Sequence, residues 1–220
     1  MPKVKEMKEM IDSVLANNKH MENMREIIKV MEKVDRKLFV KTDNPYIDIP
    51  VSIGYGQTIS QPTTVARMLS LLDLKKGDNV LEIGSGSGWN AVLIACIVNP
   101  GKVYSIERIQ GLSKLAKSNY GSVKEQLKID NIEFFFGDAL ERKEKIWRKK
   151  YDKITATAAA DLNFVEDLIY MGEQLLEDEG LLLFPTEEGN LELYKKKDKK
   201  LKKVYSEHGF AFVPLVKGIE

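Results

Sequence analysis

The sequence predicts an α/β domain, a doubly wound and mostly parallel sheet with helices on both faces and an antiparallel hairpin at its end. Between residues 79 and 184, short apolar runs typical of buried strands alternate with longer helical patterns. The run Val80–Ile83 leads directly into a glycine-rich turn, Gly84–Gly88, and then into the apolar helical segment 91–98. Near the end of the chain, two strand-like segments follow each other without a helical pattern, which favours a hairpin.

Each expected element rests on its own pattern. Residues 3–34 read as helical, because four apolar residues between 24 and 31 form a stripe with helical spacing. Residues 39–61 are rich in proline and glycine and are predicted to form a long irregular loop. Pro62 suits the first turn of the next helix, with Ser60 near its N-cap. The expected strands are 79–83, 102–106, 132–136, 152–157, 181–184, 191–195 and a segment ending at 210–215, and the expected helices include 111–128 and 161–176.

Composition limits the classes of function. The 220 residues suffice for one domain, and a net charge of +1 gives no sign of nucleic-acid binding. The single cysteine, Cys96, allows no internal disulfide and favours a reducing compartment. Residues 1–8 lack the apolar core of a signal peptide, and no apolar run approaches membrane-spanning length, so we expect a cytoplasmic protein that binds no membrane. Seven lysines between 195 and 203 indicate a solvated hairpin tip, with an RNA-binding patch as the alternative.

The glycine turn indicates the type of cofactor. Its pattern is G-x-G-x-G, and Trp89 stands where a dinucleotide fingerprint needs its third glycine. No basic residue is placed to meet a pyrophosphate, so an adenosine-containing cofactor without one is favoured over NAD. The pattern resembles the first motif of class I S-adenosylmethionine-dependent methyltransferases, which implies S-adenosylmethionine as the cofactor. No metal site is expected.

Two acids follow the next two strands. Glu107 comes 21 residues after Gly86, close to the usual spacing of a ribose-binding acid. Asp138 follows the strand after that, where an acid can accept from the adenine amino group. Each acid alone suits a helix N-terminus, and the glycines alone suit a tight turn, but together at three successive strand ends they predict a cofactor site. The predicted cofactor-binding residues are Thr58, Ile59, Gly84, Ser85, Gly86, Ser87, Gly88, Glu107, Arg108, Asp138, Ala139 and Thr157.

The loop Ile53–Pro62 resembles the segment before the cofactor domain of protein-L-isoaspartate O-methyltransferases. The resemblance extends to most of the chain, through segments 34–40, 80–88, 104–108, 151–160 and 212–215. Asp35 departs from it where proline is usual, and Ala139 departs where glycine is common, which puts the backbone beside the adenine in question. The resemblance implies three parts of one methyltransferase domain: an N-terminal helical extension and active-site loop (1–61), a cofactor-binding core (62–190) and a C-terminal hairpin (191–220).

The resemblance also implies the reaction, methylation of the free α-carboxylate of L-isoaspartyl residues in damaged proteins, by an enzyme that we expect to be a monomer. Ser60 is then the catalytic residue, and the implied substrate-binding residues are Gly56, Gln57, Ser60, Ala158 and Val213. The chemistry agrees, because a carboxylate is already ionised near pH 7 and needs no general base, and the chain has only two histidines, His20 and His208. The alternatives are a tRNA adenosine methyltransferase of the same fold and a non-catalytic cofactor-binding regulator.

Overall fold

The computed structural model describes residues 2–220, with side-chain environments from residue 5 onward. Within this range the α-helices are α1 (Pro2–Asn18), α2 (Met24–Lys33), α3 (Pro62–Leu71), α4 (Trp89–Val98), α5 (Gln110–Leu127) and α6 (Leu162–Leu175). Two short 3₁₀ helices are η1 (Arg36–Leu38) and η2 (Lys145–Arg148). The strands are β1 (Val51–Gly54), β2 (Gln57–Ile59), β3 (Val80–Ile83), β4 (Val103–Glu107), β5 (Ile132–Phe136), β6 (Tyr151–Ala156), β7 (Leu176–Pro185), β8 (Asn190–Lys197) and β9 (Lys200–His208).

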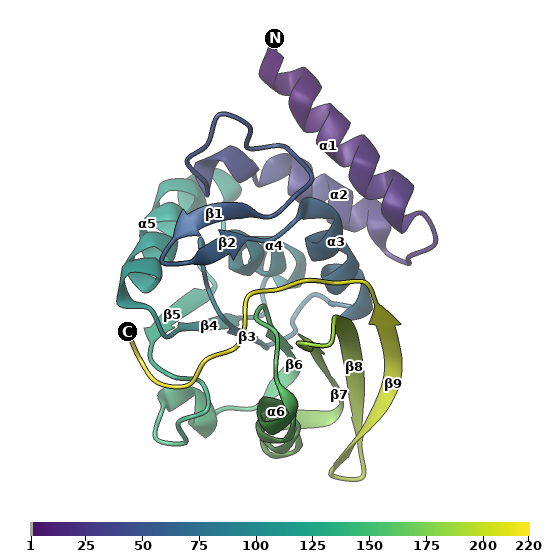
Figure 1. Cartoon of the computed structure of the whole chain (residues 1–220), viewed down its shortest axis with the longest axis vertical. Helices are drawn as coiled ribbons and strands as arrows, with labels where there is room; N and C mark the ends of the chain where they lie inside the picture. Colours follow the sequence, from purple (N-terminus) through teal and green to yellow (C-terminus); the bar gives the residue numbers. More distant parts are fainter. Residues whose placement is uncertain (1) are drawn as a thin grey trace.

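Seven strands form the main sheet in the order β5-β4-β3-β6-β7-β8-β9 (Figure 1). The neighbours from β5 to β7 are parallel, and β8 and β9 complete the sheet as an antiparallel pair. This confirms the predicted doubly wound sheet with its terminal hairpin. Strand order reverses at β3, which has β4 on one side and β6 on the other, and ligands of open α/β sheets bind at such a switch point.

Hydrophobic cores cover both faces of the sheet. Along β3, Val80 faces the core formed with α2, α3, α4 and α5, while Leu81 and Ile83 face the core formed with α6 and η2. Burial on both faces explains why the central strands read as continuous apolar runs rather than as alternating patterns. It also places the carboxyl ends of β3, β4, β5 and β6 at one edge, where the glycine turn and the two acids follow.

The N-terminal region contains two helices rather than one continuous helical segment. Residues 19–23 separate α1 from α2, and Asn23 caps α2 in the left-handed conformation with a φ of 57°. The break begins directly after Asn17 and Asn18, whose helix propensity is low. The predicted apolar stripe of α2 is confirmed, because its four residues are buried against the main domain.

The loop predicted over residues 39–61 holds a small hairpin of β1 and β2. The prediction of irregular structure throughout was wrong, because Tyr55 and Gly56, both with positive φ, form a tight turn between two very short strands. The tip of this hairpin reaches the start of α5, where a Cβ built on Gly111 would overlap the ring of Tyr55. The hairpin therefore lies over the edge of the sheet that carries the glycine turn.

The last predicted strand was placed too late in the sequence. The strand β9 ends at His208, and Gly209, with a φ of 114°, turns the chain away from the sheet edge. Residues 210–220 then run back across the carboxyl ends of the strands towards β4 and β5 (Figure 1). Val213 O accepts a hydrogen bond from Ala159 N at 2.8 Å, and Leu215 N donates to Ala159 O at 2.7 Å. Val213 consequently lies beside the predicted site, although not on a strand.

Candidate functional site

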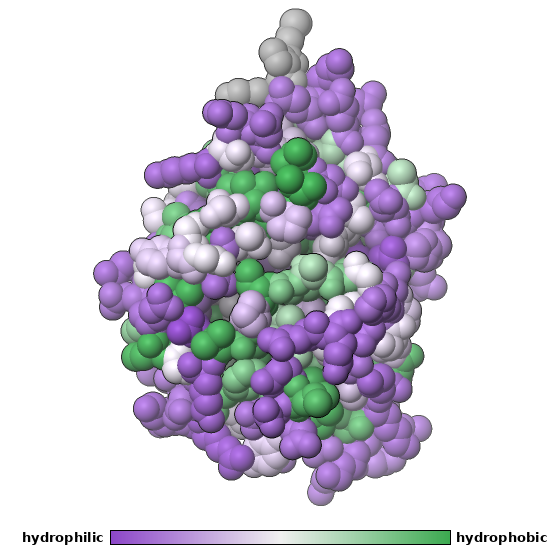
Figure 2. All heavy atoms as spheres, in the orientation of Figure 1, coloured by the Kyte–Doolittle hydropathy of each residue, from purple (hydrophilic) through white to green (hydrophobic). Residues whose placement is uncertain are grey.

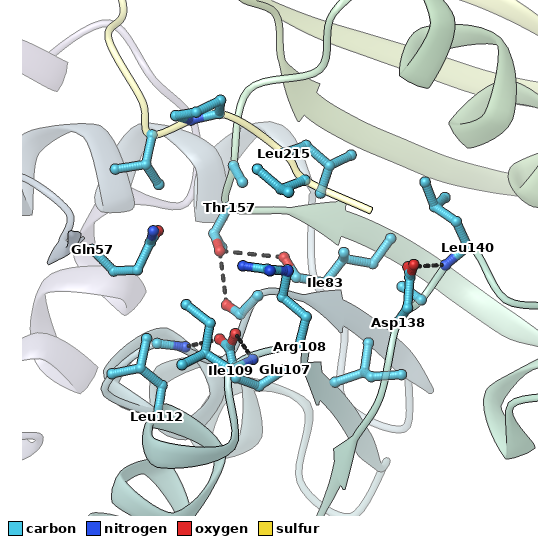
Figure 3. Close-up of a pocket in the computed structure, with 18 of the residues that line it drawn as sticks. Gln57, Ile83, Glu107, Arg108, Ile109, Leu112, Asp138, Leu140, Thr157 and Leu215 are labelled. Carbon is cyan, nitrogen blue, oxygen red and sulfur yellow. Dashed lines mark hydrogen bonds between the residues drawn. The ribbon is translucent and has the colours of Figure 1, made fainter. Parts of the chain in front are cut away.

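The carboxyl ends of β3, β4 and β6 meet around the glycine turn. Gly84 N donates to Ile106 O of β4 at 2.8 Å, and Thr157 N donates to Ile83 O at 3.0 Å. The Thr157 hydroxyl donates to Gly84 O at 2.7 Å, so the turn is fixed from both neighbouring strands. Figure 3 shows Glu107 from the end of β4, Arg108 directly after it, Asp138 from the loop after β5 and Thr157 from the loop after β6 around one pocket.

The glycines of the turn are required by the backbone. Gly84, Gly86 and Gly88 all have positive φ, which side chains disfavour. A Cβ on Gly84 would lie 2.6 Å from Thr157 Oγ1, and one on Gly88 would lie 3.1 Å from the Ala116 Cα of α5. The turn therefore holds its backbone close to the pocket and brings the start of α4 tightly against α5.

The Glu107 carboxylate is 5% exposed and anchors the turn. Its Oε2 accepts from Gly86 N at 2.9 Å, and its Oε1 accepts from Ile109 N, at the start of α5, at 3.0 Å. The N-cap of α5 is Ile109, so Glu107 bonds to the cap residue and is not itself the cap, as the alternative interpretation had it. Each carboxylate oxygen can accept a further hydrogen bond, so Glu107 retains acceptors for a pair of ribose hydroxyls at the pocket surface.

Asp138 and Arg108 are held by the end of the chain, which the sequence did not indicate. We call residues Leu215–Glu220 the C-terminal strap. Asp138 Oδ1 accepts from Leu140 N at 2.9 Å, while its Oδ2 accepts from Gly218 N in the strap at 2.6 Å. Arg108 Nε donates to Gly218 O at 2.7 Å, and Glu220 N donates to Arg108 O at 2.9 Å. The strap thus closes one side of the pocket and orients both residues.

A change of Gly218 to proline is expected to weaken cofactor binding. Proline lacks the N–H that Asp138 accepts, and its φ near −65° is incompatible with the φ of 86° at this position. We expect the Kd for S-adenosyl-L-homocysteine, measured by calorimetry, to rise about 10-fold or more, because one hydrogen bond to a charged group is worth about 1.5–3 kcal/mol. Replacement of the exposed Lys217 by alanine is the control and should leave the Kd unchanged. Tighter binding by Gly218→Pro would mean that the strap competes for Asp138.

The pocket walls combine predicted polar residues with apolar residues that the sequence analysis missed. Of the predicted residues, those lining this pocket are Gln57, Thr58, Gly84, Gly86, Glu107, Arg108, Asp138, Ala139, Thr157, Ala158 and Val213. The missed residues are Ile83, Ile106, Ile109, Leu112, Gly137, Leu140, Pro214, Leu215 and Val216. A usable signal existed for Ile83, Ile106 and Ile109, because apolar residues at or just after the carboxyl ends of the predicted strands lie at the same edge as the acids. These side chains provide the flat apolar surfaces that an adenine ring requires.

A second cavity is a groove beside the cofactor pocket, and Ser60 is one of its lining residues. Its other lining residues are Pro50, Thr58, Gln61, Thr64, Thr157 and Gly209–Val213. Ser60 also lines a small cavity against the turn, together with Thr58, Ile59, Ser85 and Ser87. The groove and the cofactor side of the site therefore adjoin at three residues, Thr58, Ser60 and Thr157. We call this place the junction. Figure 2 shows weakly polar and hydrophobic side chains across the middle of this face, framed by hydrophilic ones.

The Ser60 hydroxyl forms no hydrogen bond with another residue in the described part of the chain. The N-cap of α3 is Gln61, so Ser60 lies next to the cap, as predicted, but does not itself cap the helix. Two predicted residues, Gly56 and Gly88, line neither the pocket, nor the groove, nor the small cavity. Gly56 shapes the hairpin turn and Gly88 the packing of α4 on α5, so both act through the backbone.

Neither of the two histidines lines the pocket. His20 contacts Arg67 at 3.0 Å, and His208 contacts Asn190 at 3.2 Å, both away from the pocket lining. Among residues 2–220 there is no group of three or more histidine, cysteine, aspartate or glutamate side chains that could hold a metal ion. No helix in this range is long and apolar enough to cross a membrane.

A buried acid lies beneath the turn. Glu82, on β3, accepts from Ser105 Oγ and from Asn90 Nδ2, and the Ser105 hydroxyl also contacts the Ser85 hydroxyl of the turn. Burial, with a smaller contribution from the charge of Glu107, raises the pKa of Glu82 from its usual 4.5 to about 7, against the lowering effect of the two hydrogen bonds. Glu82 therefore takes up a proton on folding between these two pH values.

The raised pKa predicts a pH dependence of stability. The folded state binds more protons than the unfolded state between pH 4.5 and 7, so the free energy of unfolding falls as pH rises through this range. The contribution of Glu82 is about 3 kcal/mol, because each pH unit between the two pKa values changes the free energy of unfolding by about 1.4 kcal/mol. We expect urea unfolding of Glu82→Gln to lack this fall, while the exposed Glu133→Gln retains it. Equal pH profiles for Glu82→Gln and the wild type would contradict the assignment.

The sheet order, the glycine turn and the acid after β4 define a class I S-adenosylmethionine-dependent methyltransferase. The family model described as protein-L-isoaspartate(D-aspartate) O-methyltransferase matches residues 5–220. The chain therefore belongs to the protein-L-isoaspartate O-methyltransferase family, as its resemblance implied.

Individual relatives agree with this membership. The protein-L-isoaspartate O-methyltransferase of Thermosipho melanesiensis is 40% identical over 199 residues, which cover 87% of this chain and 94% of that protein. The enzyme of the same name from Fervidobacterium nodosum is 43% identical over 165 residues, covering 73% of this chain and 77% of its own. Among solved structures, a Plasmodium falciparum protein described by the same activity, in complex with S-adenosyl-L-homocysteine, superposes with a TM-score of 0.81 at 28% identity and covers 96% of this chain and 99% of its own.

Proposed function

We propose that this protein transfers the methyl group of S-adenosylmethionine to the free α-carboxylate of L-isoaspartyl residues in damaged proteins, with Ser60 as the catalytic residue. Family membership supports the reaction class. The observation that carries the finer assignment is the position of the Ser60 hydroxyl, which lines both the groove and the cofactor side of the site and has no partner among the described residues.

The residues present fit the cofactor. Glu107 would hold the ribose hydroxyls, Asp138 would accept from the adenine amino group, and the backbone of Gly84–Gly86 would lie against the rest of the molecule. Thr58 and Thr157 would enclose it from the side of the groove. When bound, S-adenosylmethionine supplies an electrophilic methyl group.

The chain's own residues need only bind and orient the nucleophile. An isoaspartyl α-carboxylate, with a pKa of roughly 4, is ionised at pH 7 and accepts the methyl group without losing a proton. The site matches this requirement, because its junction carries the hydroxyls of Thr58, Ser60 and Thr157 and no histidine. The Ser60 hydroxyl donates to one carboxylate oxygen and so fixes the orientation of the other.

The groove suits a kinked main chain in varied sequence contexts. Its lining from Gly209 to Val213 presents an irregular backbone, with Phe210 and Phe212 as apolar contacts. Recognition through the backbone, with Val213 and Ala158 near the junction, would tolerate different side chains in the substrate. Gln57, beside Thr58, lies at the cofactor side of the same junction.

We further propose that the protein acts as a cytoplasmic monomer that binds neither nucleic acid nor membranes, with the three parts of one domain set out above. Its lysine-rich hairpin supports the absence of nucleic acid, because Lys195, Lys200 and Lys203 form ion pairs with glutamates. Lys196 is buried, and its ammonium group donates to Glu173 O at 2.7 Å near the end of α6. These lysines are thus largely engaged within the fold.

Transfer of a labelled methyl group tests the proposal. The protein is incubated with S-[methyl-³H]adenosylmethionine and an isoaspartyl peptide, the same peptide with normal aspartate, or unmodified tRNA. We expect base-labile label only on the isoaspartyl peptide, since a methyl ester hydrolyses in mild base. Labelling of tRNA alone would support an RNA methyltransferase, and cofactor binding without any transfer would support a regulator.

A further inference from the structure

Arg36 is fully buried at the base of the active-site loop. It belongs to η1 and has none of its surface exposed. Its guanidinium donates to four backbone carbonyls, Ser60 O at 2.8 Å, Pro45 O at 3.0 Å, and Ile49 O and Ile59 O at 3.4 Å each. All four carbonyls belong to the segment that leads into Ser60. A single side chain therefore fixes that segment at several points.

The charge of Arg36 is held without an ion pair. None of the ion pairs in the described part of the chain includes it. Asp48 acts on it electrostatically, but this carboxylate accepts its hydrogen bonds from Thr63 N and Ser13 Oγ. Burial lowers the pKa of Arg36 to about 10, so the group stays protonated at neutral pH. Taking such a group out of water is costly, which makes a purely space-filling role a poor explanation.

Arg36 also connects the loop to the cofactor turn. Its guanidinium lies 4.7 Å from the ring centre of Trp89, the first residue of α4 directly after Gly88. The Trp89 indole in turn donates to Val34 O at 3.1 Å, two residues before Arg36. The backbone of Ser60 and the start of α4 are thereby fixed to the same planar group.

We propose that Arg36 is a positioning residue for methyl transfer, whose fork of donors holds the Ile59–Ser60 backbone against Trp89 so that the Ser60 hydroxyl faces the cofactor turn. The inference rests on the proposed role of Ser60. Arg36 itself lines neither the pocket nor the groove, and it reaches the groove only through the backbone of Ser60. It acts by fixing the distance between the Ser60 hydroxyl, which binds the nucleophile, and the cofactor. An error of about 1 Å in this distance costs on the order of 100-fold in rate.

A double-mutant cycle separates positioning from stability. Arg36→Lys keeps the charge but replaces the planar fork by a single ammonium group. In the wild-type background we expect kcat for an isoaspartyl peptide to fall roughly 10- to 100-fold. In the Ser60→Ala background the same change should lower kcat by less than about 3-fold, because the hydroxyl that Arg36 positions is already absent. The Kd for S-adenosyl-L-homocysteine should change less than about 3-fold, and any fall in Tm should be equal in both backgrounds.

Arg67→Lys is the matched control. Arg67 is also nearly buried, but it pairs with Glu207 and contacts Asn18, away from Ser60. We expect this variant to lose Tm and to keep its kcat. If Arg36→Lys does not fold, Arg36→Gln serves as the second variant, because its amide can still reach one carbonyl, and the same non-additivity is expected.

Three results overturn the inference. The first is that Arg36→Lys lowers kcat by the same factor in the Ser60→Ala background as in the wild-type background. The second is a rise in the Kd for S-adenosyl-L-homocysteine by the same factor as the fall in kcat. The third is a normal kcat for Arg36→Lys in an enzyme that depends on Ser60. Failure of the proposed function is seen separately, because the wild-type protein would then not methylate the isoaspartyl peptide at all.

Discussion

Replacement of Glu107 by alanine is expected to abolish measurable binding of S-adenosyl-L-homocysteine. The carboxylate is buried and accepts hydrogen bonds from Gly86 N and Ile109 N. Its removal leaves two buried donors without acceptors, releases the turn and deletes the predicted acceptor for the ribose. Hydrogen bonds to a charged group are each worth about 1.5–3 kcal/mol, so the Kd should rise at least about 100-fold.

Calorimetric titration with S-adenosyl-L-homocysteine measures this effect directly. Glu133→Ala is the matched control, because Glu133 is an exposed glutamate on the adjacent strand β5 and should bind normally. Circular dichroism of Glu107→Ala at 25 °C establishes that the variant is folded. A folded Glu107→Ala that binds with the wild-type Kd would refute the assignment of Glu107.

Replacement of Ser60 by alanine is expected to lower kcat by about 100-fold, the magnitude found when one donor to a reacting oxygen is removed. Because Ser60 is partly exposed and its hydroxyl bonds to no other described residue, neither the Tm nor the Kd for S-adenosyl-L-homocysteine should change much. The KM for the isoaspartyl peptide should rise only modestly, because the groove from Gly209 to Val213 is untouched.

Steady-state kinetics with an isoaspartyl peptide provide the measurement. Ser52→Ala is the control. Ser52 is an exposed serine on β1 of the hairpin that leads into Ser60, and its hydroxyl hydrogen-bonds only with Gly54 N. It should keep the wild-type kcat. A Ser60→Ala enzyme with unchanged kcat would remove the hydroxyl from the proposed mechanism and leave desolvation and placement as the remaining contributions.

The elements that could be predicted are those whose signal is local. The strands β3, β4 and β6 are largely buried and β5 is an apolar edge strand, so their apolar runs are visible in the sequence, and Gly84–Gly88 marks the turn. The acids Glu107 and Asp138 follow from their place after those strands. The hairpin of β1 and β2 was missed because strands of four and three residues give too little alternation to detect.

Other features depend on contacts between distant residues. The apolar segment 210–215 resembles a strand in sequence, but the last strand, β9, ends earlier, at His208. Its alternation of apolar and polar residues is obscured by the lysines of an exposed edge strand. The bond between Gly218 and Asp138 joins residues 80 positions apart, and nothing near either one indicates it. Arg36 reads as a surface charge, and only the folded loop shows that four carbonyls surround it.

The C-terminal strap has a consequence for folding. The cofactor pocket takes its walls from residues spread between Gln57 and Val216, so it exists only once the hairpin of β1 and β2, the sheet and the strap have come together. Partly folded chains therefore lack the site, and the cofactor gains no affinity for them. The free energy of binding is then added in full to the free energy of global unfolding, by RT ln(1 + [L]/Kd). Cofactor concentration should accordingly regulate how long the protein survives as well as how fast it works.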